Sequence, residues 1–233
     1  VPGKAPAELA RAIKAGQPLS VSQTVTVFTT ANLRGAIDLL PRLATLILRE
    51  RRTAEGVTLL LDLGDTCSPE SWVCRATQGR APFLLLDAIG YDAAFIGGEA
   101  MPIAPDAFRR LRDRIVMPLF LWHRASDLTR REMTFHFAAG SATLPPSTPG
   151  FRITREGSAL AAEEAGTIRL GDVPAEHIGR VAIRWPECAI VDARAIPLDD
   201  SEQPEPTIAA VLDLVIEEAQ SLAQQQGESY EPG

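Results

Sequence analysis

In the first half of the chain, apolar runs of strand length alternate with segments of helical periodicity. In chain order the predicted elements are a strand at Thr24–Thr30, a helix at Leu39–Arg52, a strand at Val57–Leu63, a helix at Ala76–Ile89, a strand at Asp92–Gly97, a helix at Pro105–Ile115 and a strand at Met117–Trp122. Apolar strands that alternate with helices predict βαβ units around a largely parallel sheet.

After Trp122 the pattern changes to short β-like runs joined by turn signals, with a proline-rich break at Leu144–Gly150. These runs are Met133–Ala139, Gly150–Glu156, Gly166–Leu170, His177–Trp185 and Cys188–Ile196. They predict an antiparallel or mixed sheet. The last element, Pro206–Gln225, has apolar residues at spacings of three and four, which is typical of an amphipathic helix that closes a domain.

The chain divides into three parts on this pattern. Residues 1–23 form an N-terminal arm with one short predicted helix, Ala7–Ala15, and resemble a leader or a docking arm. Residues 24–225 contain the alternating elements and form one α/β domain. Residues 226–233 are a polar tail.

Composition and charge narrow the range of binding partners. The chain is 45% hydrophobic, which is ordinary for a globular protein of 233 residues. Thirty acidic and 23 basic residues give a net charge of -7, which gives no support to binding of nucleic acid or of anionic membranes through phosphate contacts. No apolar run approaches the roughly 18 residues that a membrane span requires. We therefore expect neither nucleic acid nor a membrane span.

Three cysteines are too few for a disulfide scaffold, and none forms a C-x-x-C pair. Cys67 and Cys74 share one loop and can form a disulfide in an oxidising compartment. Of the two alternatives we expect idle thiols, because free cysteine behaves as a small buried hydrophobe in most proteins.

Marked turns follow three of the predicted strands. The first turn holds Asn32, Arg34 and Gly35, the second contains Gly64-Asp65, and the third reads Gly97-Gly98-Glu99. They lie about one βα unit apart along the chain. Because ligands of open α/β sheets bind outside the carboxyl ends of the strands, we expect the three turns to converge on one edge.

The ordered series of these segments resembles a known family. The series runs from T-x-N-L-x-G and P-R-L-A through V-T-L-L-L-D-L-G-D-T to L-L-D-A-I-G-Y-D-A-A-F-I-G-G-E. It resembles the calcineurin-like metallophosphoesterases, in particular their 5'-nucleotidase and cyclic-phosphodiesterase branch, over most of Thr24–Gln225. The resemblance implies a layered α/β/β/α fold, with a parallel or mixed sheet in the first half, antiparallel or mixed strands in the second, and a closing C-terminal helix.

The resemblance also implies a site of two divalent metals that activate a bridging hydroxide. Its ligands come from D-x-H, G-D and G-N-H-E turns, a later histidine and a G-H-x-H turn. Carried over, the first aspartate falls on Asn32 and its histidine on Arg34, and the second-turn aspartate is Asp65. The third-turn asparagine and histidine fall on Gly98 and Glu99. These are the positions of a degenerate site.

The second half of the family's ligand set has no counterpart in this sequence. No G-H-x-H occurs, and the three histidines, His123, His136 and His177, lie in settings unlike a ligand set. The stretch from Ala138 to Gly166 is too short for the family's later strands, so we expect a brief connection in their place.

Three functional hypotheses follow. The first is a non-catalytic phosphoesterase-like domain that works as a binding or accessory subunit with a protein partner or in a larger assembly, and that needs no cofactor. Arg34 then substitutes for the metal charge by pairing with Asp65 or Glu99.

The second is a residual phosphoric-ester hydrolase with one Mn, Mg or Ca ion held by Asn32, Asp65 and Glu99, a set of oxygen ligands that suits a hard cation. The third is a metal-free binder of a nucleotide or another anion through Arg34 and the glycine turns. We expect the first, and no residue is assigned a catalytic role. The residues leave the compartment open; relatives of this branch are often exported, so the resemblance implies an extracytoplasmic location.

Overall fold

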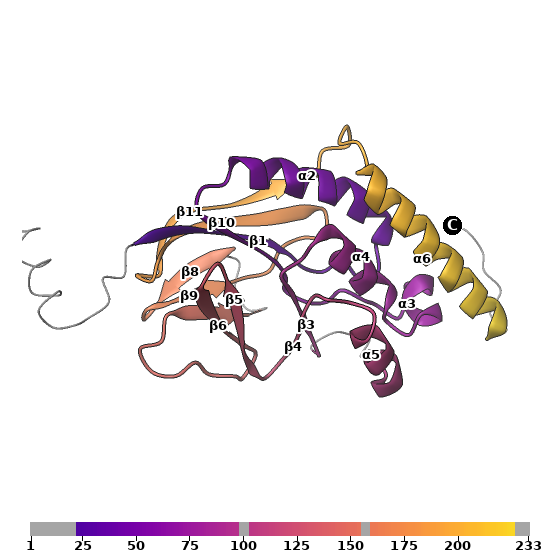
Figure 1. Cartoon of the computed structure of the whole chain (residues 1–233), viewed down its shortest axis with the longest axis horizontal. Helices are drawn as coiled ribbons and strands as arrows, with labels where there is room; N and C mark the ends of the chain where they lie inside the picture. Colours follow the sequence, from indigo (N-terminus) through magenta and orange to yellow (C-terminus); the bar gives the residue numbers. More distant parts are fainter. Residues whose placement is uncertain (1–21, 98–102, 155–158, 227–233) are drawn as a thin grey trace, which may run out of the picture.

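The computed structural model describes residues 22–97, 103–154 and 159–226 (Figure 1). Its elements in chain order are β1 (Gln23–Thr30), the 3-10 helix η1 (Ile37–Leu39), α2 (Leu40–Thr53), β2 (Val57–Asp62), α3 (Trp72–Ala76), α4 (Ala81–Ile89), β3 (Ala93–Ile96), α5 (Pro105–Arg112), β4 (Leu119–Leu121), β5 (Ala125–Arg130), β6 (Met133–Ala139), β7 (Gly150–Ile153), β8 (Ala161–Glu164), β9 (Thr167–Leu170), β10 (His177–Trp185), β11 (Ala189–Pro197) and α6 (Pro206–Gln225). The predicted helix Ala7–Ala15, Gly98 and Glu99 lie outside the described residues.

A six-stranded sheet, sheet A, forms the centre of the molecule, with the strand order β11-β10-β1-β2-β3-β4. The strands β1 to β4 run parallel to one another, whereas β10 and β11 are antiparallel additions on the other side of β1. Val25 and Phe28 of β1 are fully buried although they face opposite sides of the sheet. Burial continues through Thr26, Thr29 and Thr30, so both faces of β1 are covered, as in a central strand.

A second, five-stranded sheet, sheet B, has the order β5-β6-β7-β9-β8 and contains both parallel and antiparallel pairs. It packs against sheet A through an aromatic core. The rings of Phe151 on β7 and Trp185 on β10 stack with their centroids 5.6 Å apart, and Phe95 on β3 meets Phe137 on β6 edge to face at 6.0 Å. Aromatic contacts of this kind add to the stabilisation from the buried area.

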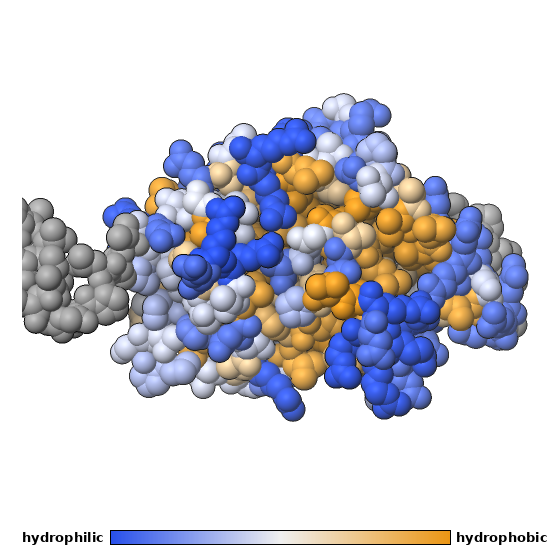
Figure 2. Space-filling view, viewed as in Figure 1, coloured by the Kyte–Doolittle hydropathy of each residue, from blue (hydrophilic) through white to orange (hydrophobic). Residues whose placement is uncertain are grey.

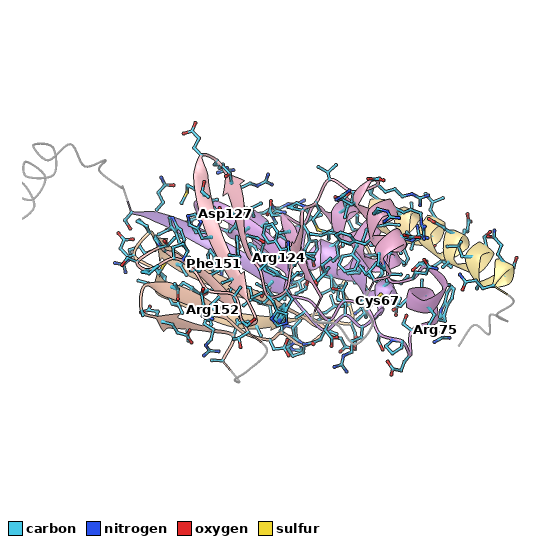
Figure 3. All side chains as sticks on the ribbon, turned by 90° about the horizontal axis from the view of Figure 1, so that it is seen from below. Cys67, Arg75, Arg124, Asp127, Phe151 and Arg152 are labelled. Carbon is cyan, nitrogen blue, oxygen red and sulfur yellow. A yellow bond between two sulfur atoms is a disulfide. The ribbon has the colours of Figure 1, made fainter. Side chains whose placement is uncertain are left out.

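The helices cover the opposite face of sheet A, so the described residues form helix, sheet A and sheet B layers (Figure 1). Figure 3 shows Phe151 and Arg152 on sheet B and Cys67 at the end of the molecule that carries α3. The layered α/β prediction, with mixed sheets and a closing C-terminal helix, is confirmed. Along the described chain no helix combines the length and apolarity needed to cross a bilayer.

The structure departs from the predicted elements at three places. The helix expected at Ala76–Ile89 is interrupted, because Gln78 and Gly79 adopt positive φ values of 53° and 81° and separate α3 from α4. The strands β5 and β8 were not predicted; their outward positions are polar or small. The stretch from Ala138 to Gly166 is more than a brief connection, since it contains β8 as well as β7, the strand predicted from Gly150.

The expectation of idle thiols at Cys67 and Cys74 is wrong. The two residues form a disulfide between the loop after β2 and helix α3, with their Cα atoms 5.8 Å apart. The hydroxyl of Ser71, which caps α3, accepts from the Cys74 backbone N–H at 3.5 Å and so orients this short helix. Local folding of the loop thus brings the two sulfurs into bonding distance, which their sequence spacing alone does not show. Cys188 is free and buried.

Candidate functional site

The turns after β1 and β2 lie side by side at the carboxyl edge of sheet A. Backbone hydrogen bonds continue past the strand ends, from the N–H of Asn32 to the oxygen of Gly64 at 3.0 Å and from the N–H of Arg34 to the oxygen of Asp65 at 2.9 Å. The N–H of Gly35 then donates to the oxygen of Thr66 at 2.8 Å. The structure therefore brings together the first two of the three predicted turns.

Three non-glycine residues of these turns adopt the left-handed conformation. The φ values of Asn32, Arg34 and Asp65 are 57°, 49° and 58°. Asparagine and aspartate tolerate this region because their side chains bond locally, whereas arginine does so less readily. Such backbone positions gather at sites where the surrounding structure holds a loop in one shape.

Arg34 and Asp65 form an ion pair across the two turns. The Nε of Arg34 donates to Oδ2 of Asp65 at 2.8 Å, and this hydrogen bond, followed by the charge of Asp65, raises the pKa of Arg34. Asp65 is only 8% exposed, whereas the side chain of Arg34 is 68% exposed. The expected pairing with Asp65 is present, but it joins a buried carboxylate to a guanidinium that largely faces solvent.

The side chain of Asn32 is tied to the second half of the chain. Its Nδ2 donates to Oδ1 of Asp172 at 2.8 Å and to the backbone oxygen of Val173 at 2.9 Å. Asp172 lies in the loop between β9 and β10 and was not predicted as part of the site. Its sequence signal was a Gly-Asp pair directly after a predicted strand, as at Asp65.

A buried polar network supports the two turns from below. Asp62, which is fully buried, accepts hydrogen bonds from Thr30 Oγ1 at 2.9 Å and from Thr66 Oγ1 at 2.7 Å. The hydroxyl of Tyr91, at the entry to β3, lies 3.0 Å from Thr30 Oγ1. Burial, together with the charge of Asp62, raises the pKa of Tyr91, so this phenol stays protonated. The network connects β1, β2 and β3 beneath the site.

The third turn is described only at its start. Gly97 follows β3 with a φ of 97°, and the N–H of Trp122, directly after β4, donates to the Ile96 oxygen at the same sheet edge. The positions Gly98 and Glu99 lie outside the described residues, so their predicted place at this edge stays a prediction.

Each of the three histidines has a different setting within the described residues. His123 bonds Ser141 after β4, His136 bonds Asp127 at 2.7 Å on sheet B, and His177 begins β10.

The chemistry of the described edge is that of an arginine surrounded by acids. Glu70 and Asp172 lie close enough to Arg34 to raise its pKa further, after Asp65. Within residues 22–97, 103–154 and 159–226, no group of three or more His, Cys, Asp or Glu side chains is arranged to hold a metal ion. Of the candidate ligands that are described, Asn32 and Asp65 both have protein partners.

No protein-family model matches the chain, and no curated protein matches it. Fifteen chains of solved structures match it. One of them, a crystal structure, is 11% identical, covers 75% of this chain and 99% of its own length, and superposes with a TM-score of 0.49.

Proposed function

We propose that the protein is a non-catalytic, phosphoesterase-like domain that acts as a binding or accessory subunit. The observation that carries this proposal is the hydrogen-bonded ion pair between Arg34 and Asp65. Asp65 is the one carboxylate of the first two turns that matches the resembled ligand set, and it already has a cation as its partner. A guanidinium beside a carboxylate opposes the binding of a divalent ion there, because the two positive charges repel each other.

Asn32 of the first turn supports the same conclusion. The amide nitrogen of Asn32 faces two oxygen acceptors, Asp172 Oδ1 and the Val173 carbonyl. An amide held in this way ties the loop between β9 and β10 to the first turn. Asn32 thus has a structural role in joining the two halves of the domain at this edge.

Metal binding tests the proposal directly. We expect the wild-type protein, incubated with manganese and zinc and then desalted, to carry substoichiometric metal by mass spectrometry and to hydrolyse no generic phosphate ester. Arg34→Gln removes the charge while keeping a polar side chain, and we expect it to raise manganese affinity by about tenfold, the effect of one unit charge about 5 Å from a divalent ion in water. The matched control, Arg34→Lys, keeps the charge and should not raise it.

One equivalent of metal in the wild type that is lost in Asp65→Asn would overturn the proposal. It would support the second hypothesis, a residual hydrolase with a single ion at Asn32, Asp65 and Glu99. Manganese-dependent ester hydrolysis that disappears with the same substitution would assign that activity to this edge.

A metal-free anion site is favoured by one observation, the 68% exposure of the Arg34 side chain. The neighbouring acids Asp65, Glu70 and Asp172 oppose it, because they surround the guanidinium with negative charge. Stabilisation of the wild type by inorganic phosphate or ATP, absent in Arg34→Gln, would favour an anion site over our proposal. No shift in melting temperature with either probe is the expected result.

The disulfide between Cys67 and Cys74 bears on the compartment. Disulfides persist in oxidising environments and are rare in reducing ones. We therefore propose an extracytoplasmic location, in agreement with the resemblance. Titration of free thiols tests for the bridge on protein that is purified without reductant and then unfolded: one thiol, that of Cys188, is expected, and three would contradict the bridge.

A further inference from the structure

Helix α5 and the turn after it form a basic surface on a chain that is acidic overall. Residues 105–114 carry four arginines and two aspartates, although the whole chain has a net charge of -7. The four arginines are exposed, and Figure 2 shows a strongly hydrophilic area where Figure 1 places α5. A run of arginines is usually a solvated helix face, so the neighbouring elements decide whether it can bind a ligand. We call these four arginines and the one that caps the start of α4 the arginine surface, namely Arg80, Arg109, Arg110, Arg112 and Arg114.

Arg80 adds a buried guanidinium to the exposed arginines of α5. It follows the left-handed residues Gln78 and Gly79 that separate α3 from α4, and its side chain is 7% exposed. Its Nε donates to the backbone oxygen of Thr77 at 3.0 Å. Its Nη1 lies 3.6 Å from Oε1 of Glu218, which is beyond hydrogen-bonding distance. An arginine has five N–H donors, and within the described residues those on Nη1 and Nη2 of Arg80 have no hydrogen-bond acceptor.

Two of these arginines share a single carboxylate oxygen. Nη1 of Arg114 donates to Oε1 of Glu218 at 3.0 Å, the same oxygen that Arg80 approaches. Burial lowers the pKa of Arg80, Glu218 opposes this effect, and the charges of Arg110 and Arg114 lower the pKa further. Arg110 itself bonds only the neutral side chain of Gln78, at 3.0 Å, within the described chain. Three guanidinium groups thus gather around one carboxylate, which leaves positive charge without a counterion.

The shared carboxylate is open to the outside of the molecule. The side chains of Arg114 and Glu218 are 52% and 36% exposed, and both line a groove of about 420 Å³ between α4 and α6. Asp87 is a second acid in this groove, and its Oδ1 accepts from the backbone N–H of Val116 at 3.0 Å and of Met117 at 2.7 Å. A carboxylate held by two backbone N–H groups is bound in place, so Asp87 does not move to neutralise the arginines.

Carboxylates suit the arginine surface better than phosphates do. The position of Glu218 shows that one carboxylate fits between Arg80 and Arg114, and its contact through a single oxygen leaves other donors of both arginines available. A phosphate would concentrate two negative charges beside Glu218 and Asp87, which repel it. The carboxylates of an acidic peptide are spaced along the chain, so each can meet a different arginine, and the planar guanidinium binds a carboxylate with two parallel hydrogen bonds.

We propose that the arginine surface binds an acidic segment of a partner protein, whose aspartate or glutamate side chains pair with Arg80, Arg110 and Arg114. Complementary charge of this kind speeds association and selects the partner. This inference does not rest on the proposed function, because the arginine surface contains no residue of the candidate site. Peptide binding is also measured independently of metal content and hydrolysis, so one proposal can fail while the other holds.

Fluorescence anisotropy with a labelled peptide of six glutamates tests the proposal on the full chain. We expect the wild type to bind this peptide and not a peptide of six glutamines. Arg114→Gln should weaken binding by about tenfold, the effect of losing one charge-assisted hydrogen bond. Arg80→Lys keeps the charge but removes the planar fork, and it should weaken binding severalfold. The matched control is Arg194→Gln on β11, an arginine that is also 52% exposed and also faces a glutamate, and it should bind as the wild type does.

A change of opposite sign sharpens the test. Glu218→Gln removes the carboxylate that competes for Arg80 and Arg114, so we expect it to strengthen binding of the glutamate peptide by about fivefold, the effect of one unit charge about 4 Å away in water. Unchanged circular dichroism verifies that each variant folds. No binding by the wild type, or an equal loss in the Arg194→Gln control, would overturn the proposal. Stabilisation by inorganic phosphate or ATP that is lost in Arg114→Gln would also overturn it, because the surface would then bind phosphates.

Discussion

Replacing Asp62 with alanine removes one buried acceptor from three donors beneath the candidate site. These donors are Thr30 Oγ1 at 2.9 Å, Thr66 Oγ1 at 2.7 Å and the Gly64 N–H at 3.1 Å. Asp62 is fully buried, so bulk water does not replace the lost acceptor. Hydrogen bonds to an ionised carboxylate stabilise by about 1.5–3 kcal/mol each, and removal of the buried charge recovers part of its desolvation cost. We expect the free energy of unfolding to fall by about 3–5 kcal/mol.

The assay is equilibrium unfolding in urea, followed by far-UV circular dichroism and by tryptophan fluorescence. If the carboxylate acts in the folded state, the midpoint should decrease while the slope of the transition stays unchanged. The matched control is Asp65→Asn in the same turn. Asn tolerates the positive φ of this position, and the partner of Asp65 is an exposed guanidinium, so we expect a midpoint close to that of the wild type.

The difference in stability loss between the Asp62 and Asp65 variants tests this assignment. They lie three residues apart, and the structure assigns support of the fold to Asp62 and a place in the candidate site to Asp65. A loss below about 1 kcal/mol for Asp62→Ala would show that the buried network contributes little to stability. A larger loss for Asp65→Asn than for Asp62→Ala would reverse the assignment.

Three further predictions concern the backbone and the cysteines. Gly35→Ala should destabilise by more than about 2 kcal/mol, because its Cβ would overlap a neighbouring side chain at a φ of 86°, whereas Gly90→Ala, at a φ of 89° in open space, should lose only about 1 kcal/mol in urea unfolding. Reducing the Cys67–Cys74 disulfide removes a loop constraint from the unfolded chain and so raises its conformational entropy. The free energy of unfolding, measured with and without reductant, should therefore fall by about 2.5 kcal/mol, and no change would contradict the chain-entropy argument. Burial raises the pKa of the Cys188 thiol, so native protein keeps this proton where the unfolded chain loses it, and stability should decrease as pH rises above about 8.5; a Cys188→Ala variant should lack that component.

The amino-acid sequence alone determined the layered α/β architecture. The parallel strands β1 to β3 were predicted because runs of strand length alternate with segments of helical periodicity, and α6 was predicted because its apolar positions recur at helical spacing. The strands β5 and β8 were missed, since one face of each is exposed and their alternation is short. The interruption between α3 and α4 depends on two left-handed residues, which periodicity does not register.

The tertiary structure alone decided how the candidate site is assembled. Sequence motifs identified Asn32, Arg34 and Asp65, because turns after parallel strands must meet at one edge. They did not identify Asp172, which is distant in the chain and reaches Asn32 only when sheet B packs against sheet A. The disulfide between Cys67 and Cys74 was predicted wrongly for another reason, because it depends on how their shared loop folds and sequence spacing does not show that. Local patterns record burial and turn geometry, whereas contacts between distant segments depend on how the layers pack.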